Sequence, residues 1–171
     1  MAKAGAEGSR KRTVKEREKY IMSLVNQMTL DEKIGMIHGA GLFRTAGVPR
    51  LGIPELHMSD GPMGVRQEFV DNDWKNVYDS DDTVTYLPSN SAIAATWNPK
   101  RAKECGEVLG AEARGRGKDV ILAPGINIKR TQLCGRNFEY MSEDPYLVSE
   151  MTVPLIKLSL IHISEPTRQA E

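Results

Sequence analysis

The sequence predicts an α/β fold in which helices alternate with the strands of a parallel sheet. The predicted elements follow the order helix, strand, helix, strand, loop and helix. Residues 119–123 form a nearly continuous apolar run, which is typical of a parallel strand covered by helices on both faces. Turn residues close both predicted strands, at Asp60-Gly61-Pro62 and at Pro124-Gly125. A chain of 171 residues is long enough to bury the core of one such domain.

The N-terminal third is expected to contain an arm and two helices. Residues 1–12 are small, polar and basic, and we expect a disordered arm there. Residues 29–32, Thr-Leu-Asp-Glu, form a capping box that opens a short second helix. The first helix is predicted over residues 14–27, where apolar side chains recur at helical spacing: Tyr20, Ile21, Leu24 and Val25.

The middle of the chain alternates loops with one strand. Residues 40–54 are rich in Gly and Pro and are predicted to form a loop. Residues 54–59 follow, with apolar side chains at alternate positions 56 and 58, and predict a strand. Residues 67–86 are acidic and irregular, which predicts a long loop of the kind that a compact domain keeps for a function.

The last two helices have clear start signals. Asn98 is placed to cap a helix with Pro99 at its first position, and Gly115 and Gly117 are placed to end it. The strand over residues 119–123 comes next. Residues 142–145, Ser-Glu-Asp-Pro, then begin a helix that is expected to run to position 156.

Composition excludes several classes of partner. Lys+Arg and Asp+Glu are equal at 23 each, so no overall field attracts nucleic acid. Residues 1–19 hold seven basic and three acidic side chains without interleaved aromatic residues, which favours a solvated tail over a nucleic-acid contact. The sequence has no apolar run of the roughly 18 residues that a membrane-spanning helix needs, and it has no signal-peptide pattern. Its two cysteines are too few for a disulfide framework. We therefore expect no nucleic-acid partner, no membrane association and a cytoplasmic location.

The end of the first predicted strand carries a candidate binding residue. In parallel α/β folds, functional side chains collect at the carboxyl ends of strands. Asp60 directly follows the apolar strand, and a carboxylate there can accept hydrogen bonds from two adjacent sugar hydroxyls. The run Ser-Asp-Gly-Pro is also suited to an Asx-turn, in which Asp60 only shapes the backbone. Both interpretations stand at this level.

The segment after the second predicted strand carries several cations. Arg136 lies on a glycine-bearing loop and can present a planar fork of donors to hydroxyls or to a carboxylate. Lys129 and Arg130 could act in the same way. The alternative for Arg136 is a structural ion pair with Glu139 or Asp144.

Several motifs occur in order along residues 28–157. They are Gly52-Ile53-Pro54, Met58 to Arg66, Ala94 to Asn98, Ala123 to Arg130 and Gly135 to Leu147. Together they resemble the N-terminal domain of glycoside hydrolase family 3, and the run Cys-Gly-Arg-Asn-Phe-Glu-Tyr looks most like the bacterial β-glucosidase branch. Each motif alone is weak, but their order makes the resemblance specific.

The resemblance implies a fold and a set of site residues. It implies that residues 13–157 are the N-terminal part of a (β/α)₈, TIM-like barrel domain. It further implies that Asp60 and Arg136 bind the substrate sugar and that no metal or cofactor takes part. The catalytic nucleophile and the acid/base residue cannot be assigned and are expected beyond the end of this chain. Five further residues could line the site: His57, Arg66, Trp74, Lys129 and Arg130.

The resemblance also implies an activity for the parent protein. That activity is hydrolysis of terminal non-reducing β-D-glucosyl residues by a retaining double displacement, with a β-glucoside or oligosaccharide as substrate. The chain alone, with part of the sugar subsite, is expected to be inactive. The alternatives are a β-xylosidase or arabinofuranosidase of the same family, and a non-catalytic carbohydrate-binding half-domain. Residues 158–171 depart from the family pattern, resemble translated sequencing-adapter DNA, and are expected to be a non-native tail.

Overall fold

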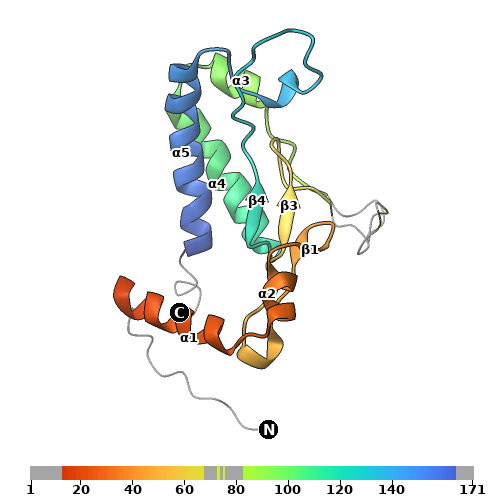
Figure 1. Ribbon diagram of the computed structural model, residues 1–171. Helices are drawn as coiled ribbons and strands as arrows, with labels where there is room; N and C mark the ends of the chain where they lie inside the picture. Colours follow the sequence, from red (N-terminus) through yellow and green to blue (C-terminus); the bar gives the residue numbers. More distant parts are fainter. Residues whose placement is uncertain (1–12, 68–72, 74, 76–82, 165–171) are drawn as a thin grey trace.

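The computed structural model describes residues 13–67, 73, 75 and 83–164 (Figure 1). The predicted arm over residues 1–12 and Trp74 lie outside these ranges. In the described part of the chain, no helix combines the length and apolar character needed to cross a bilayer. The elements are α1 (Val14–Gln27), α2 (Leu30–Met36), β1 (Gly39–Gly41), β2 (Arg44–Thr45), η1 (Pro49–Leu51), β3 (Met58–Asp60), α3 (Asn90–Ala95), α4 (Pro99–Gly115), β4 (Val120–Leu122), η2 (Asn137–Glu139) and α5 (Pro145–Ser164).

A parallel pair of strands forms the centre of the fold. Strands β3 and β4 pair in parallel, with Met58 opposite Val120 and Asp60 opposite Leu122. Helix α4 lies between them in the chain, so β3, α4 and β4 make the crossover unit that parallel strands need. Figure 1 shows α4 and α5 side by side, to one side of this strand pair. The predicted α/β alternation is present.

Strand β4 differs from its prediction in burial. A strand covered on both faces was expected, yet Val120 is 37% and Leu122 48% exposed. Successive side chains of a strand point to opposite faces. Ile121 packs against the core formed with α4 and α5, whereas its two neighbours point the other way, where the described residues leave them exposed. The expectation of two covered faces was therefore wrong for this chain.

Several short elements also depart from prediction. The predicted loop over residues 40–54 contains the antiparallel pair β1–β2 and the single turn η1, and it includes the buried Val48. Strand β3 begins at Met58 rather than at position 54. Helix α3 was not predicted; Ser89 caps it by accepting a hydrogen bond from the Ala92 N–H. Elements this short take their stability from tertiary contacts, which periodicity in the sequence does not report.

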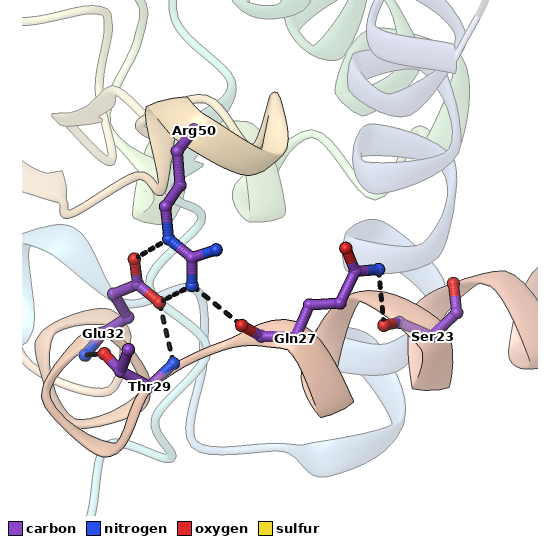
Figure 2. Close-up of polar contacts among 5 residues, drawn as sticks. All are labelled: Ser23, Gln27, Thr29, Glu32 and Arg50. Carbon is purple, nitrogen blue, oxygen red and sulfur yellow. Dashed lines mark hydrogen bonds and ion pairs between the residues drawn. The ribbon is translucent and has the colours of Figure 1, made fainter.

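The first two helices confirm their predictions and are joined by one arginine. Helix α2 begins with the predicted Thr29–Glu32 capping box. Arg50 Nε and Nη2 donate to the two Glu32 carboxylate oxygens at 2.6 and 2.5 Å, and Nη2 also donates to the Gln27 carbonyl at 2.8 Å (Figure 2). The hydrogen bond from Arg50 is the main cause that lowers the pKa of Glu32 to about 2. Arg50 thus ties the end of α1 and the start of α2 to η1.

The hydrophobic core lies where α4 meets α5. Gly106 on α4 faces the Leu155 backbone so closely that an added Cβ would collide with the Leu155 carbonyl oxygen. The missing side chain lets the two helices approach, and larger apolar side chains fill the space around this contact. The core includes Ala102, Leu109 and Ala113 of α4, Leu147, Val148, Met151 and Leu155 of α5, Ile93 and Ala94 of α3, and Val65, Leu87 and Met141 from the connecting segments.

Candidate functional site

Two strand ends bring the predicted sugar-binding residues to one cavity. Asp60 is the last residue of β3, and Arg136 lies on the segment that follows β4. Both line a cavity of about 230 Å³, which we call the Asp60–Arg136 cavity. Its other lining residues are Pro62, Leu122, Pro124, Gly125, Ile126, Asn127, Glu139 and Tyr140.

Asp60 is held by the loop that follows it. Arg66 Nη1 donates to Asp60 Oδ2 at 3.0 Å, and the Arg66 N–H donates to the Asp60 carbonyl at 3.1 Å. This return of the chain needs glycine at two positions. Gly61 has φ 143° and its Cβ would meet the Gly64 carbonyl oxygen, while Gly64 has φ 139° and its Cβ would meet the Thr85 carbonyl oxygen. The turn chemistry of the sequence and the carboxylate at the cavity therefore coexist in one motif.

Arg136 both makes an ion pair and lines the cavity. Its Nε donates to the Glu139 carboxylate three residues later, which was the structural alternative considered for it. The Arg136 side chain is nevertheless 73% exposed, so much of the guanidinium can still meet a ligand. The hydrogen bond from Arg136 to Glu139 is the main cause that raises the pKa of the Arg136 guanidinium, and the negative charge of Asp60 adds to it.

Glu139 is buried, and hydrogen bonds from side chains of α3 hold its backbone in place. The Asn90 side-chain amide donates to the Glu139 carbonyl at 2.7 Å, and the Ser91 hydroxyl donates to the Tyr140 carbonyl at 2.8 Å. Gly125 approaches the same segment, because an added Cβ there would collide with the Glu139 carbonyl oxygen. The N-terminal end of α3 and the chain after β4 thus set the position of the Glu139 carboxylate that holds Arg136.

Lys129 and Arg130 lie at a neighbouring cavity of about 390 Å³. Lys129 Nζ donates to Ser91 Oγ at 2.7 Å, which joins Lys129 to the α3 contacts described above. Arg130 is exposed and lines the same cavity as Ser142 and Glu143. These two cations are therefore near the candidate site, but neither lines the Asp60–Arg136 cavity.

His57 lies at the other end of β3. It precedes Met58, its N–H donates to Asp119 Oδ2 at 2.9 Å, and its Nε2 lies 3.8 Å from Glu55 Oε2. It is not among the residues that line the cavity. Trp74, the remaining predicted lining residue, lies outside the described residues.

The arrangement suits recognition of a polyhydroxylated ligand. A carboxylate supplies only acceptors and a guanidinium supplies only donors, so together they can match hydroxyls that do both. The other walls combine apolar side chains with the Asn127 amide, and small-molecule sites typically combine such surfaces with a few fixed polar groups. Across the described ranges, His, Cys, Asp and Glu nowhere gather in threes as a metal ion would require.

Sequence reasoning missed Glu139 and Asn90 as parts of this site. Glu139 had been considered only as a partner for Arg136, and its three-residue spacing was the signal for this contact. Asn90 carried no signal, because its hydrogen bond reaches 49 residues along the chain. Only the fold brings such distant residues together.

Comparison with known proteins identifies relatives over most of the chain. A protein-family model described as "Glycosyl hydrolase family 3 N terminal domain" matches residues 55–158. A β-glucosidase of Bacteroides ovatus is 51% identical over 140 residues, which are 82% of this chain and 19% of the relative. Thermostable β-glucosidase B of Acetivibrio thermocellus is 42% identical over 80% of this chain and 18% of its own length. The chain thus spans about a fifth of the length of these relatives.

Solved structures agree with this result. Beta-glucosidase 3B of Thermotoga neapolitana in complex with α-D-glucose is similar, with a TM-score of 0.72 and 36% identity, over 84% of this chain and 22% of that structure. A β-glucosidase of Kluyveromyces marxianus in complex with glucose also has a TM-score of 0.72, with 29% identity over 81% of this chain and 16% of that structure. The likeness confirms the predicted fold class, part of a TIM-like (β/α)₈ barrel.

Proposed function

Because this chain belongs to glycosyl hydrolase family 3, we propose that it forms part of a sugar-binding subsite in a β-glucosidase. The proposed domain comprises residues 13–157. The whole protein would hydrolyse terminal, non-reducing β-D-glucosyl residues of glucosides or oligosaccharides. Support comes from the relatives, which are β-glucosidases, and from similar structures that were solved with glucose.

One observation carries the proposal. Asp60 and Arg136 lie 76 positions apart in the sequence, yet they line one cavity at the carboxyl ends of the parallel strands β3 and β4. This is the edge of an α/β barrel at which active sites form. A carboxylate on a strand end and an arginine on the following loop are suited to bind a sugar hydroxyl pair from two sides.

Each of four residues has a proposed role in binding. Asp60 accepts hydrogen bonds from sugar hydroxyls through the carboxylate oxygens, while Arg66 fixes the orientation of the carboxylate. Arg136 donates to the sugar from the other side, and Glu139 positions the Arg136 guanidinium. Such hydrogen bonds accelerate a reaction when they strengthen in the transition state.

The proposed chemistry is retention by double displacement. It needs two carboxyl groups about 5–5.5 Å apart, one as nucleophile and one as acid and base. Asp60 and Glu139 are already engaged by Arg66 and Arg136, and we assign neither of them to these roles. We therefore propose that residues 1–171 bind sugar but do not hydrolyse glycosides by themselves.

A pentoside is the second candidate substrate. An exo-α-(1→6)-L-arabinopyranosidase of Bifidobacterium longum is 35% identical over 78% of this chain. Asp60 and Arg136 can bind hydroxyls that hexoses and pentoses share, so these two residues do not select between the sugars. Comparing hydrolysis of aryl glucosides, xylosides and arabinosides would decide between the candidates.

The proposal is tested in a hybrid enzyme. The segment of this chain that matches the Bacteroides ovatus β-glucosidase replaces the corresponding 140 residues of that enzyme. We expect the hybrid enzyme to hydrolyse nitrophenyl β-glucoside. A folded hybrid enzyme without β-glucosidase activity would refute the proposal, and the unaltered Bacteroides enzyme is the control.

A further inference from the structure

The cavity of about 390 Å³ at Lys129 and Arg130 has an excess of positive charge. We call it the Lys129 cavity. Among the described residues that line it, these two cations are accompanied by a single carboxylate, that of Glu143. None of its lining residues also lines the Asp60–Arg136 cavity. The Lys129 cavity is therefore a separate feature of the chain with a charge of its own.

The Lys129 side chain is half-buried and held in place. Its Nζ donates to Ser91 Oγ at 2.7 Å, and Ser91 Oγ donates in turn to the Tyr140 carbonyl at 2.8 Å. The Lys129 backbone N–H donates to the Ser142 carbonyl at 3.2 Å. An ammonium group has three N–H donors, so two remain after the contact with Ser91. The cavity thus contains a positioned positive charge with donors that a ligand can use.

Neither cation is neutralised by a carboxylate of the described residues. Lys129 donates to a hydroxyl, Arg130 is exposed, and Glu143 lines the cavity without forming an ion pair with either of them. A half-buried charge has lost part of its hydration, which costs free energy unless an opposite charge compensates for it. An anion bound in the Lys129 cavity would provide this compensation.

The polar groups of this segment suit the oxygens of a phosphate. Arg130 can bind two phosphate oxygens through its planar fork, and the Lys129 ammonium can bind a third as a point charge. Thr131 Oγ1 accepts from the Leu133 N–H at 3.3 Å, which leaves the Thr131 hydroxyl hydrogen as a further donor. The segment follows β4, at the carboxyl ends of the parallel strands, and phosphate sites of α/β barrels often form at this edge.

We infer that the Lys129 cavity binds a phosphate group. Lys129 and Arg130 supply the positive charge, and Ser91 positions the Lys129 ammonium. The phosphate is either free inorganic phosphate or the phosphate group of a sugar phosphate. The inference is independent of the proposed function, because it involves no residue of the Asp60–Arg136 cavity.

The test is a titration of the full 171-residue chain with inorganic phosphate, followed by amide NMR. Sodium chloride replaces phosphate at the same ionic strength in the control titration, so that screening of charges is equal in both. We expect saturable shifts at Thr131 and Ser142 with phosphate alone, and a Kd on the order of 1 mM, which a few charge-assisted hydrogen bonds can provide. Shifts that do not saturate, or that chloride reproduces, would overturn the site.

Variants locate the binding. Lys129→Met removes the charge and keeps an apolar stem, and Arg130→Gln removes the planar fork; each should weaken phosphate binding at least about tenfold. Lys103→Met is the matched control, because Lys103 is exposed on α4 and does not line the cavity. Arg130 is exposed, so its variant should fold even if Lys129→Met disturbs the contact with α3. Affinity for phosphate that survives both substitutions would overturn the assignment.

Glucose 6-phosphate and glucose distinguish the two sources of phosphate. Tighter binding of glucose 6-phosphate than of inorganic phosphate, with shifts at Asp60 as well as at Thr131, would assign the site to a sugar phosphate. Equal affinity, with shifts confined to the Lys129 cavity, would assign it to free phosphate. Saturable binding of neither would overturn the site, whereas shifts at Asp60 with glucose alone test the proposed function separately.

Discussion

Arg66 Nη1 donates to Asp60 Oδ2 at 3.0 Å, and the Arg66 backbone also binds the Asp60 carbonyl. The two residues are six positions apart, on either side of the turn that begins at Gly61. A carboxylate on a strand end could otherwise rotate. The arginine fixes one of its oxygens and leaves the other for a ligand at the cavity. In the proposed function, this contact preorganises Asp60 for sugar binding, which reduces the entropic cost of binding.

Removing the Asp60 carboxylate should weaken catalysis in the hybrid enzyme. Asp60→Ala removes the proposed hydrogen bonds to sugar hydroxyls, and a hydrogen bond to a charged group contributes about 1.5–3 kcal/mol. We expect kcat/KM for nitrophenyl β-glucoside to fall at least about tenfold. Glu150→Ala, which removes a carboxylate that is exposed on α5 and does not line the cavity, is the control and should have little effect. Unchanged kinetics in the Asp60 variant would refute its role in sugar binding.

The Arg136–Glu139 pair should respond to changes in geometry as well as in charge. Arg136→Lys keeps the positive charge but loses the planar fork, so we expect kcat/KM of the hybrid enzyme to fall about tenfold or more. Glu139→Gln keeps an acceptor for Arg136 and should cost less than Glu139→Ala. Steady-state kinetics on nitrophenyl β-glucoside measure both effects. Equal activity of the glutamine and alanine variants would contradict the positioning role of Glu139.

The chain alone should not turn over substrate. Purified residues 1–171 are expected to release no nitrophenol from nitrophenyl β-glucoside at a rate typical of enzymes, which is roughly 1–10³ per second. The reason is that a retaining reaction needs two catalytic carboxyl groups, and the proposed function assigns neither to this chain. The hybrid enzyme is the positive control. Turnover by the chain itself would show that carboxylates of this chain perform the chemistry.

The sequence predicted those parts of the fold that are encoded locally. The capping box at Thr29 and the helix start at Pro99 were predicted correctly, because each depends on a few adjacent residues. Helix α3 and the exposure of Leu122 were not predicted, because they depend on which distant segments lie against them.

At the candidate site, too, the sequence predicted the features that are encoded locally and missed those that depend on distant segments. Asp60 and Arg136 each follow a predicted strand, and their placement at one cavity follows from the parallel pairing of those strands. The contact of Asn90 with the Glu139 carbonyl depends on a helix that the sequence did not indicate.

The Glu32–Arg50 pair should make stability depend on pH in acid (Figure 2). Arg50 and Thr29 lower the pKa of Glu32 from 4.5 to about 2. A carboxyl group with a depressed pKa in the folded state stabilises the fold above its unfolded pKa, and this contribution is lost as pH falls. The melting temperature of the chain should therefore exceed that of Glu32→Gln by a constant amount above about pH 5, and the difference should shrink between pH 4.5 and 2.

A matched variant separates this effect from general acid denaturation. Glu104→Gln changes an exposed pair with Arg101 on α4, and exposed pairs contribute little to stability. Melting curves of the chain and of both variants are compared across the same pH range. A Glu32→Gln variant that melts with the parent chain at pH 7 would contradict the role of this pair.

The contact of Gly106 with Leu155 should tolerate no side chain. Gly106→Ala would force α4 away from α5, because the added Cβ would collide with the Leu155 carbonyl oxygen, and such overpacking costs about 1–3 kcal/mol. Gly115→Ala is the control in the same helix, since no atom lies within 4 Å of the added Cβ, and it should be neutral or stabilising by up to about 1 kcal/mol. The melting temperature should therefore fall for Gly106→Ala and stay the same or rise for Gly115→Ala, by about 2–4 °C for each kcal/mol. Equal melting temperatures for the two variants would mean that α4 and α5 do not approach each other as closely in solution.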